Sequence, residues 1–245
     1  MNMILLLLAL AQEGFTPLGE GVIDDRGTTI YLSGAAGKVE ALDAASGRVK
    51  WTSEASGRVV ATSGGKVAVE AGSGNHLKIL LLEVGTGALL WTSAKVELPE
   101  WVSTSPQAGR RFEAWATLGR GFLLYDWKAE AGYAGGAPPP AEVEKAARKS
   151  ASGRVSIDLA ALTTSAGPIP PEALQVRHAP PNEVKVGLRT YKVVRDPDRF
   201  QPGVGDQQVR RLTCVSSDPA EPGWSHPLRR ILLPALPPSA PGGRP

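Results

Sequence analysis

The sequence predicts an all-β protein: a β-propeller built from four-stranded blades of about 40 residues each, forming an incomplete or irregular ring with degenerate C-terminal blades. Three observations predict it. A segment of 13 residues beginning at Ala41 recurs at Leu81, with a constant offset of 40 positions. Residues within each copy alternate between two faces, as in strands. Three to four such strands fall within one period, which is the spacing of a propeller blade.

The amino terminus predicts export. An apolar block of eight residues, 4–11, ends in Ala9-Leu10-Ala11, the small-x-small form that signal peptidase accepts. We therefore expect a signal peptide over residues 1–11 and a bacterial protein that is periplasmic or secreted. The alternatives are a buried first strand and a misassigned start codon inside a longer protein. No apolar run reaches the roughly 18 residues that span a bilayer, so we expect no transmembrane segment.

Turn residues and tryptophans occupy matching positions in the two copies of the repeat. Ser46-Gly47 and Thr86-Gly87 are turn signals, because Gly adopts a positive φ without strain. A tryptophan follows each Gly by four positions, on the last strand of each unit. Upstream of these turns, further β-rich runs predict the remaining strands of the two blades: residues 28–33, 58–63 and 66–70.

The pattern Leu-Asp/Glu-x-x-Ser/Thr-Gly-x-x-x-Trp resembles the repeat of the pyrroloquinoline-quinone-like, or quinoprotein-type, β-propeller family. The resemblance implies that the tryptophan of one blade docks against the neighbouring blade near its Gly turn. It gives this structural role to Trp51 and Trp91. The residues that would shape the receiving turns are Asp43, Gly47, Glu83 and Gly87.

The repeat becomes irregular toward the C-terminus. A third unit is expected over Glu113–Gly132, where Asp126 follows Glu83 by 43 residues but no tryptophan follows at the repeat distance. Residues 152–159 and 183–194 read as strands. A degenerate last unit over residues 210–227 would place Trp224 in the docking role. Residues 141–149 have good helix propensity and predict a short exposed helix or an insertion.

Composition divides the chain. The first 135 residues hold three of the 21 prolines, and the remainder holds 18. We expect a signal peptide (1–11), propeller repeats (12–133), degenerate units with Pro-rich insertions (134–233) and a disordered tail (234–245). A ring of seven or eight blades would need about 280–320 residues. With 245 residues, the chain is expected to be a partial ring, a smaller irregular ring or a gene fragment.

No catalytic, cofactor-binding or metal-binding residues are expected. The Gly-rich segments at 64–66 and 72–75 lack the spacing of a phosphate-binding loop. The pair Asp24-Asp25 lacks the regular oxygen-ligand spacing of a calcium site. Cys214 is expected to be a buried, inert thiol. The three histidines are not spaced as metal ligands: His76, His178 and His226.

These features predict a non-catalytic, exported propeller that acts as a protein-interaction scaffold in the cell envelope. Its partners would be other envelope or secreted proteins. No nucleic-acid partner is expected, because the basic residues of the second half are interleaved with acidic ones. One alternative is a fragment of a quinoprotein dehydrogenase that uses pyrroloquinoline quinone and calcium. The other is a glycan- or small-ligand-binding module that would use Trp101, Trp115 or Trp127.

Overall fold

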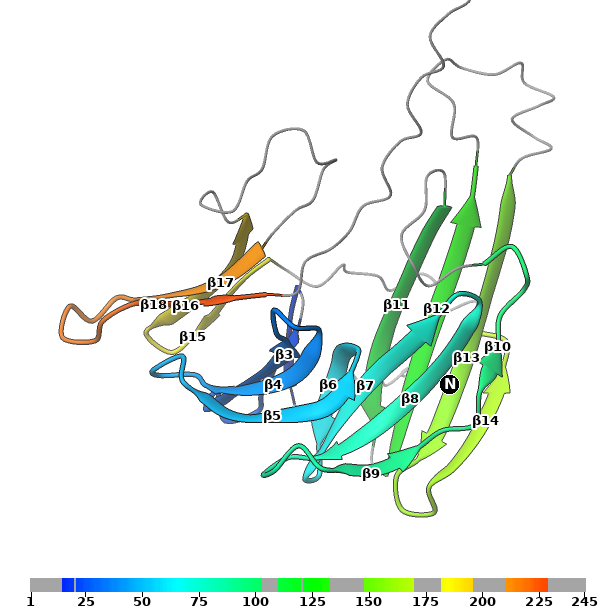
Figure 1. The fold of residues 1–245 in the computed structure, drawn as a ribbon, viewed down its shortest axis with the longest axis horizontal. Coiled ribbons are helices and arrows are strands. Elements are labelled where there is room, and N and C mark those ends of the chain that lie inside the picture. The colour runs from blue at the N-terminus through cyan, green and yellow to red at the C-terminus, as the bar shows by residue number, and fades with distance from the viewer. Residues whose placement is uncertain are drawn as a thin grey trace, which may run out of the picture.

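The computed structural model describes residues 15–19, 21–102, 110–119, 121–132, 148–169, 182–195 and 210–228. Within these ranges every regular element is a β-strand, and the strands form four antiparallel sheets (Figure 1). The predicted all-β fold is therefore confirmed, and no helix in these ranges could cross a membrane. The expected signal peptide, residues 141–147 of the expected helix, and the tail from 234 lie outside the described residues.

Each sheet is made of strands that are consecutive in the sequence. Sheet 1 has the order β1 (Phe15–Leu18), β2 (Gly21–Asp24), β3 (Thr29–Ser33), β4 (Lys38–Asp43) and β5 (Val49–Ser56). Sheet 2 contains β6 (Arg58–Ser63), β7 (Lys66–Ser73), β8 (His76–Glu83), β9 (Leu89–Thr92) and β10 (Val96–Glu97), and both β9 and β10 pair with β8.

Sheets 3 and 4 are simple four-stranded meanders. Sheet 3 contains β11 (Arg110–Gly119), β12 (Phe122–Ala131), β13 (Lys149–Asp158) and β14 (Thr163–Gly167). Sheet 4 contains β15 (Glu183–Val186), β16 (Arg189–Arg195), β17 (Arg210–Ser216) and β18 (Trp224–Pro227).

The 40-residue sequence repeat is also a structural repeat. Ala41 of β4 pairs with Trp51 of β5, and Leu81 of β8 pairs with Trp91 of β9. The ladder register shifts immediately after both pairs, between Ala41 and Leu42 and between Leu81 and Leu82. Such irregularities bend a strand and re-aim its side chains. The two tryptophans therefore leave their sheets at equivalent positions.

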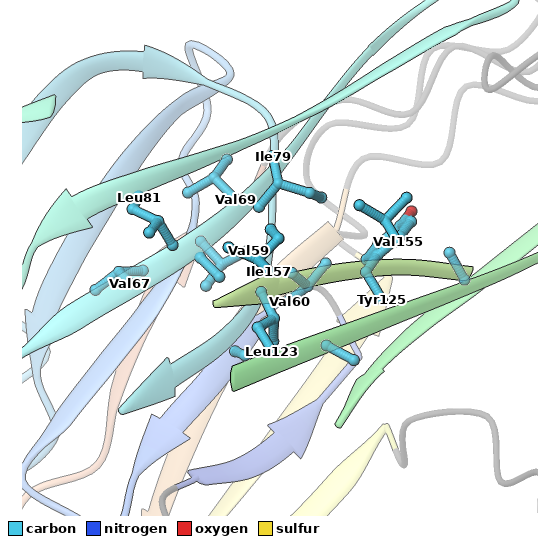
Figure 2. Close-up of a cluster of buried hydrophobic side chains, with 14 of the residues drawn as sticks. Val59, Val60, Val67, Val69, Ile79, Leu81, Leu123, Tyr125, Val155 and Ile157 are labelled. Atoms are coloured by element: carbon cyan, nitrogen blue, oxygen red, sulfur yellow. The ribbon is translucent and has the colours of Figure 1, made fainter. Parts of the chain in front are cut away.

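Two hydrophobic cores set the order of the sheets in space. One core joins sheets 1, 2 and 3; Figure 2 shows Val69, Ile79 and Leu81 of sheet 2 beside side chains of sheet 3 such as Leu123 and Ile157. The other core joins sheet 1 to sheet 4. The resulting row is sheet 4, sheet 1, sheet 2, sheet 3, with sheets 4 and 3 at opposite ends (Figure 1). The four described sheets do not close into a ring, as expected for an irregular propeller.

Two sequence predictions differ from the structure in detail. The run 183–194 forms two strands rather than one, because Gly187 takes a φ of 59° and turns the chain between β15 and β16. The third unit expected over Glu113–Gly132 corresponds to the β11–β12 hairpin alone. Strands β13 and β14 complete that sheet, so it combines strands from both sides of the boundary expected at residue 133.

Candidate functional site: the seams between sheets

The seam between sheets 1 and 2 is built around Trp51. Its indole Nε1–H donates to the carbonyl of Val84, at 2.9 Å, in the turn that connects β8 to β9. Tyr31 of β3 lies against the ring, with centroids 5.8 Å apart. The side chain of Trp51 therefore leaves its own sheet and contacts the next one through both its polar edge and its face.

Gly87 receives the face of the Trp51 ring. A Cβ built on this glycine would lie only 2.5 Å from Cε3 of Trp51, so no larger residue fits without moving the indole. Gly87 also takes a φ of 72°, which L-residues rarely adopt. Next to this contact, the hydroxyl of Ser53 donates to the Gly87 carbonyl at 2.6 Å. The structure thus brings together two residues that the repeat pattern singled out.

The acidic residue of each repeat holds the turn before the glycine. Asp43 accepts hydrogen bonds from the hydroxyl and the amide of Ser46, both at 2.8 Å, and these bonds lower the pKa of Asp43. Glu83 accepts from the hydroxyl of Thr86 at 2.6 Å and from the amide of Gly85 at 3.0 Å, and the pKa of Glu83 is lowered for the same reason. Hydrogen bonds to the charged form favour that form.

The seam between sheets 4 and 1 repeats this geometry with residues far apart in the sequence. Trp224 of β18 donates from Nε1 to the carbonyl of Ala44, at 3.3 Å, and Ala44 precedes Val84 by one repeat. The ring of Trp224 lies over Gly47, whose φ is 69°, and a Cβ there would collide with it. Tyr191 packs beside Trp224 and donates from its hydroxyl to Ala44, at 3.0 Å.

One contact distinguishes the two seams. His226 follows Trp224 by two positions, as Ser53 follows Trp51. Its Nε2 lies 2.8 Å from Oε2 of Glu40, and both side chains are largely buried between the sheets. Gly34 makes room for this pair, because a Cβ there would overlap the Glu40 carboxylate. The spacing of the histidines gave no signal for this pair, since its partner lies 186 residues away.

The seam between sheets 2 and 3 lacks the Trp–Gly contact. Trp91 lies half-buried on β9, at the edge of the first core, but it covers no described glycine. The turn of sheet 3 that corresponds to the other receiving turns begins at Asp158, which accepts from the amides of Ala160 and Ala161 at 2.8 Å. Four residues after Asp158, at the position of Gly47 and Gly87, stands Leu162 with a φ of 53°.

Polar residues reach across this third seam instead. Arg58 of β6 donates to the Glu70 carboxylate at 2.5 and 2.9 Å and to the carbonyl of Ala114 of β11 at 3.1 Å. Tyr125 of β12 is fully buried nearby, beside both Glu70 and Arg58. Burial raises the pKa of Tyr125 well above its ordinary value, and the charge of Glu70 adds to the rise.

The other candidate residues are placed as follows. Trp127 is buried, stacks on Phe112 at 6.2 Å and covers Gly153, so it is not available as an exposed platform for a glycan. Trp101 and Trp115 are half-buried. Asp24 accepts from the amide and hydroxyl of Thr28, at 2.7 and 2.8 Å, in a turn.

The remaining candidates for chemistry are the cysteine and the histidines. Cys214 is buried, as expected, and burial raises the pKa of its thiol. His178 lies outside the described residues. Among the residues that the structure does describe, no group of three or more His, Cys, Asp and Glu side chains is arranged to hold a metal ion.

Consecutive antiparallel sheets of four or five strands, arranged in a row and joined at two seams by tryptophan–glycine contacts whose glycines lie 40 residues apart, define a β-propeller type of repeat protein. Comparison with known families agrees. Residues 9–112 match the family model described as outer membrane protein assembly factor BamB. This part of the chain therefore carries PQQ-like β-propeller repeats, as the sequence pattern predicted.

The solved structures that resemble the chain include the crystal structure of BamB from Moraxella catarrhalis. The two share 17% sequence identity, with a TM-score of 0.39. The alignment covers 86% of this chain and 62% of that one, so the chain spans less than two thirds of the length of that structure. No curated protein matches the sequence.

Proposed function

We propose that this chain is a non-catalytic propeller-type scaffold that binds other proteins in the cell envelope. The observation that carries the proposal is that the polar side chains at the seams hold turns and pair with one another. Asp43 and Glu83 hold turns, and Glu40, Glu70 and Arg58 are paired within or between sheets. The match of residues 9–112 to a family described as an outer membrane protein assembly factor supports a role in assembly rather than in chemistry.

The seams supply the rigidity that such a scaffold needs. We propose that Trp51 fixes sheet 1 on sheet 2 and that Trp224 fixes sheet 4 on sheet 1. Asp43, Gly47, Glu83 and Gly87 shape the two receiving turns. Trp91 would hold sheet 2 against sheet 3 through apolar contact alone. Outer strands and hairpin tips then remain as the surfaces on which partners bind.

The export signal expected over residues 1–11 would direct the protein to the periplasm or out of the cell. Expressing the full-length chain in a Gram-negative host and fractionating the cells tests this placement. We expect a product in the periplasmic fraction that is shorter than the precursor by the signal peptide. A full-length product confined to the cytoplasm would contradict both the signal and the envelope role.

Binding of the quinone cofactor separates the scaffold from an enzyme. Purified protein would be incubated with pyrroloquinoline quinone and Ca²⁺, desalted, and examined for a bound chromophore and for alcohol-dependent dye reduction. We expect neither. Stoichiometric retention of the quinone together with dye reduction would show that the chain is a dehydrogenase.

Partner binding can be tested in cells with a photo-crosslinking amino acid at exposed hairpin tips. Suitable positions are Phe122 and Leu188, whose side chains are 43% and 60% exposed. We expect light-dependent adducts with a small, reproducible set of envelope proteins. A folded, exported protein that gives no adduct from either tip or from the outer strand β14 would count against the scaffold.

A further inference from the structure

The seam between sheets 4 and 1 contains a polar pair in largely apolar surroundings. His226 Nε2 lies 2.8 Å from Oε2 of Glu40, and each of the two side chains is only 14% exposed. Their neighbours across the ladders are buried leucines, Leu32 beside Glu40 and Leu212 beside His226. A polar or charged side chain in such surroundings is costly unless a hydrogen-bond partner meets it. Each member of the pair therefore needs the other.

The equivalent positions of the other sheets hold different residue types. Two residues after the tryptophan, sheets 1 and 2 carry a serine where sheet 4 carries His226. Three residues before the acid of the receiving turn, sheets 2 and 3 carry an aliphatic residue where sheet 1 carries Glu40. The residues at these positions are Ser53 and Ser93, and Leu80 and Val155. Serine is thus matched with an aliphatic residue, and histidine is matched with glutamate.

The two combinations do not interchange. If sheet 4 docked on sheet 2, His226 would face Leu80, which offers no acceptor to the imidazole N–H. If a strand with serine at this position docked on sheet 1, the Glu40 carboxylate would be buried against a shorter, neutral side chain. A wrong partner that leaves a buried polar group poorly paired is disfavoured, and this difference is a source of specificity.

Contacts on either side of His226 fix the alignment of sheet 4 on sheet 1. Two residues after it, Leu228 forms an isolated antiparallel bridge with Gly34. Two residues before it, Trp224 lies over Gly47. Strand β18 is therefore held at both ends of the segment that carries the imidazole, at the left of the row in Figure 1. A strand that slid along sheet 1 would lose both contacts and carry the imidazole past the carboxylate.

We infer that Glu40 and His226 form a specificity pair, which directs sheet 4, rather than a sheet with serine at this position, to the face of sheet 1 that lies away from sheet 2. A buried pair of this kind adds little stability compared with apolar residues of similar volume, whereas removing one partner is costly. Its contribution is selection among sheets that otherwise dock in the same way. The inference goes beyond the proposed scaffold function and does not depend on it.

Exchanging the partners between two chains tests the pair. One chain carries Glu40→His, the other carries His226→Glu, and the two are co-expressed under different affinity tags. Neither chain can match its own sheets 4 and 1, but each sheet 4 matches sheet 1 of the other chain. We expect reciprocal exchange of sheet 4, which gives a domain-swapped heterodimer. Sequential affinity purification should recover at least about ten times as much heterodimer as from two wild-type chains under the same tags.

Two controls separate specificity from general destabilisation. A chain that carries both substitutions, expressed under both tags, regains the pair with its partners reversed and should yield no more heterodimer than wild type. Glu183→Lys in one chain and Lys192→Glu in the other break an exposed ion pair within sheet 4, which exchange of that sheet cannot restore. These chains should also match wild type. Heterodimer in equal amount from either control, or none from the chains with exchanged partners, would overturn the inference.

Discussion

The seam between sheets 1 and 2 and the seam between sheets 2 and 3 join the same sheet to its two neighbours in different ways. On one side, Trp51 lies over Gly87 and donates to Val84. On the other side, Trp91 covers no glycine among the described residues, and Leu162 occupies the receiving position. Arg58, which is paired with Glu70 of its own sheet, donates across this seam to Ala114. The first seam is specified by shape, whereas the second depends on apolar packing and on the hydrogen bond that Arg58 donates to the Ala114 carbonyl.

The difference shows what the glycine contributes. Sheet 3 also contains a turn of the same length that is held by an acidic residue. Asp158 accepts hydrogen bonds in this turn, as Asp43 and Glu83 do in theirs. Without the glycine, the φ of 53° is imposed on a leucine, whose side chain packs at the edge of the first core. We therefore expect the residue at this position of the receiving turn to influence whether the tryptophan of the preceding sheet docks.

The largest expected effect is the loss of a docked tryptophan. Trp51→Ala should lower the free energy of unfolding by about 3 kcal/mol, because it removes the ring over Gly87 and leaves the Val84 carbonyl unpaired. Trp91→Ala, which lacks both contacts, should cost about 1 kcal/mol. Urea unfolding of the two variants compares the seams. Equal losses would show that the glycine contact adds nothing.

The ion pair should be the next most important contact. Glu70→Gln leaves the Arg58 guanidinium beside Tyr125 without its counter-charge in a largely buried place, which should cost about 2 kcal/mol. Glu54→Gln, which breaks the exposed pair with Lys38, is the control and should change stability by less than about 0.5 kcal/mol. If the two substitutions have similar effects, polar contacts do not hold the second seam.

Leu162→Gly should be stabilising. It removes the strain of a positive φ at a non-glycine residue, for a gain of about 1 kcal/mol, and it recreates the receiving position of the other turns. Leu162→Ala keeps the strain and serves as the comparison. Thermal unfolding measures both, and the emission maximum of Trp91 would shift to shorter wavelength if the indole docks. A glycine variant less stable than the alanine variant would show that the Leu162 side chain is needed for packing.

The smallest effect is on pH dependence. The pKa of Asp43 is lowered in the folded protein by the Ser46 hydroxyl and amide, so the unfolded chain binds this proton more readily. The contribution to stability is present above the ordinary carboxyl pKa of about 4 and is lost as pH falls through the folded value. Asp43→Asn should therefore reduce the loss of stability between about pH 6 and about pH 3. Urea unfolding of both proteins across this pH range measures the difference. An unchanged pH slope would contradict this role of the turn.

The sequence predicted the all-β fold, and it singled out Trp51 and Gly87, because both copies of the repeat have the same length. It was less successful where insertions change that length. Asp126, placed by its distance from Glu83, lies in the middle of β12, where it is buried and paired with Arg154 at 2.6 Å. The acid that closes the turn is Asp158, after a long segment between β12 and β13 that a fixed period does not anticipate.

The polar contacts between sheets could not be predicted for a different reason. Glu40 and His226 each look like an ordinary strand residue, and only the row of sheets brings them together. The same holds for Arg58 and Ala114. Trp224 was recognisable because an aromatic residue on a last strand is part of the repeat. Its partner Gly47 could not be chosen from the sequence, since the order of the sheets was not known.

The seam between sheets 4 and 1 also determines when folding of the protein can finish. Gly47 and Ala44 belong to the first sheet to leave the ribosome, yet the Trp224 that covers them follows 180 residues after Ala44. Until then, the apolar face of sheet 1 that includes Ile23, Ile30 and Leu42 has no cover. Contacts of such long range form slowly, and an uncovered sheet face invites wrong associations meanwhile. If the chain crosses a membrane with its amino terminus first, sheet 1 would need a chaperone on the far side of that membrane until Trp224 arrives.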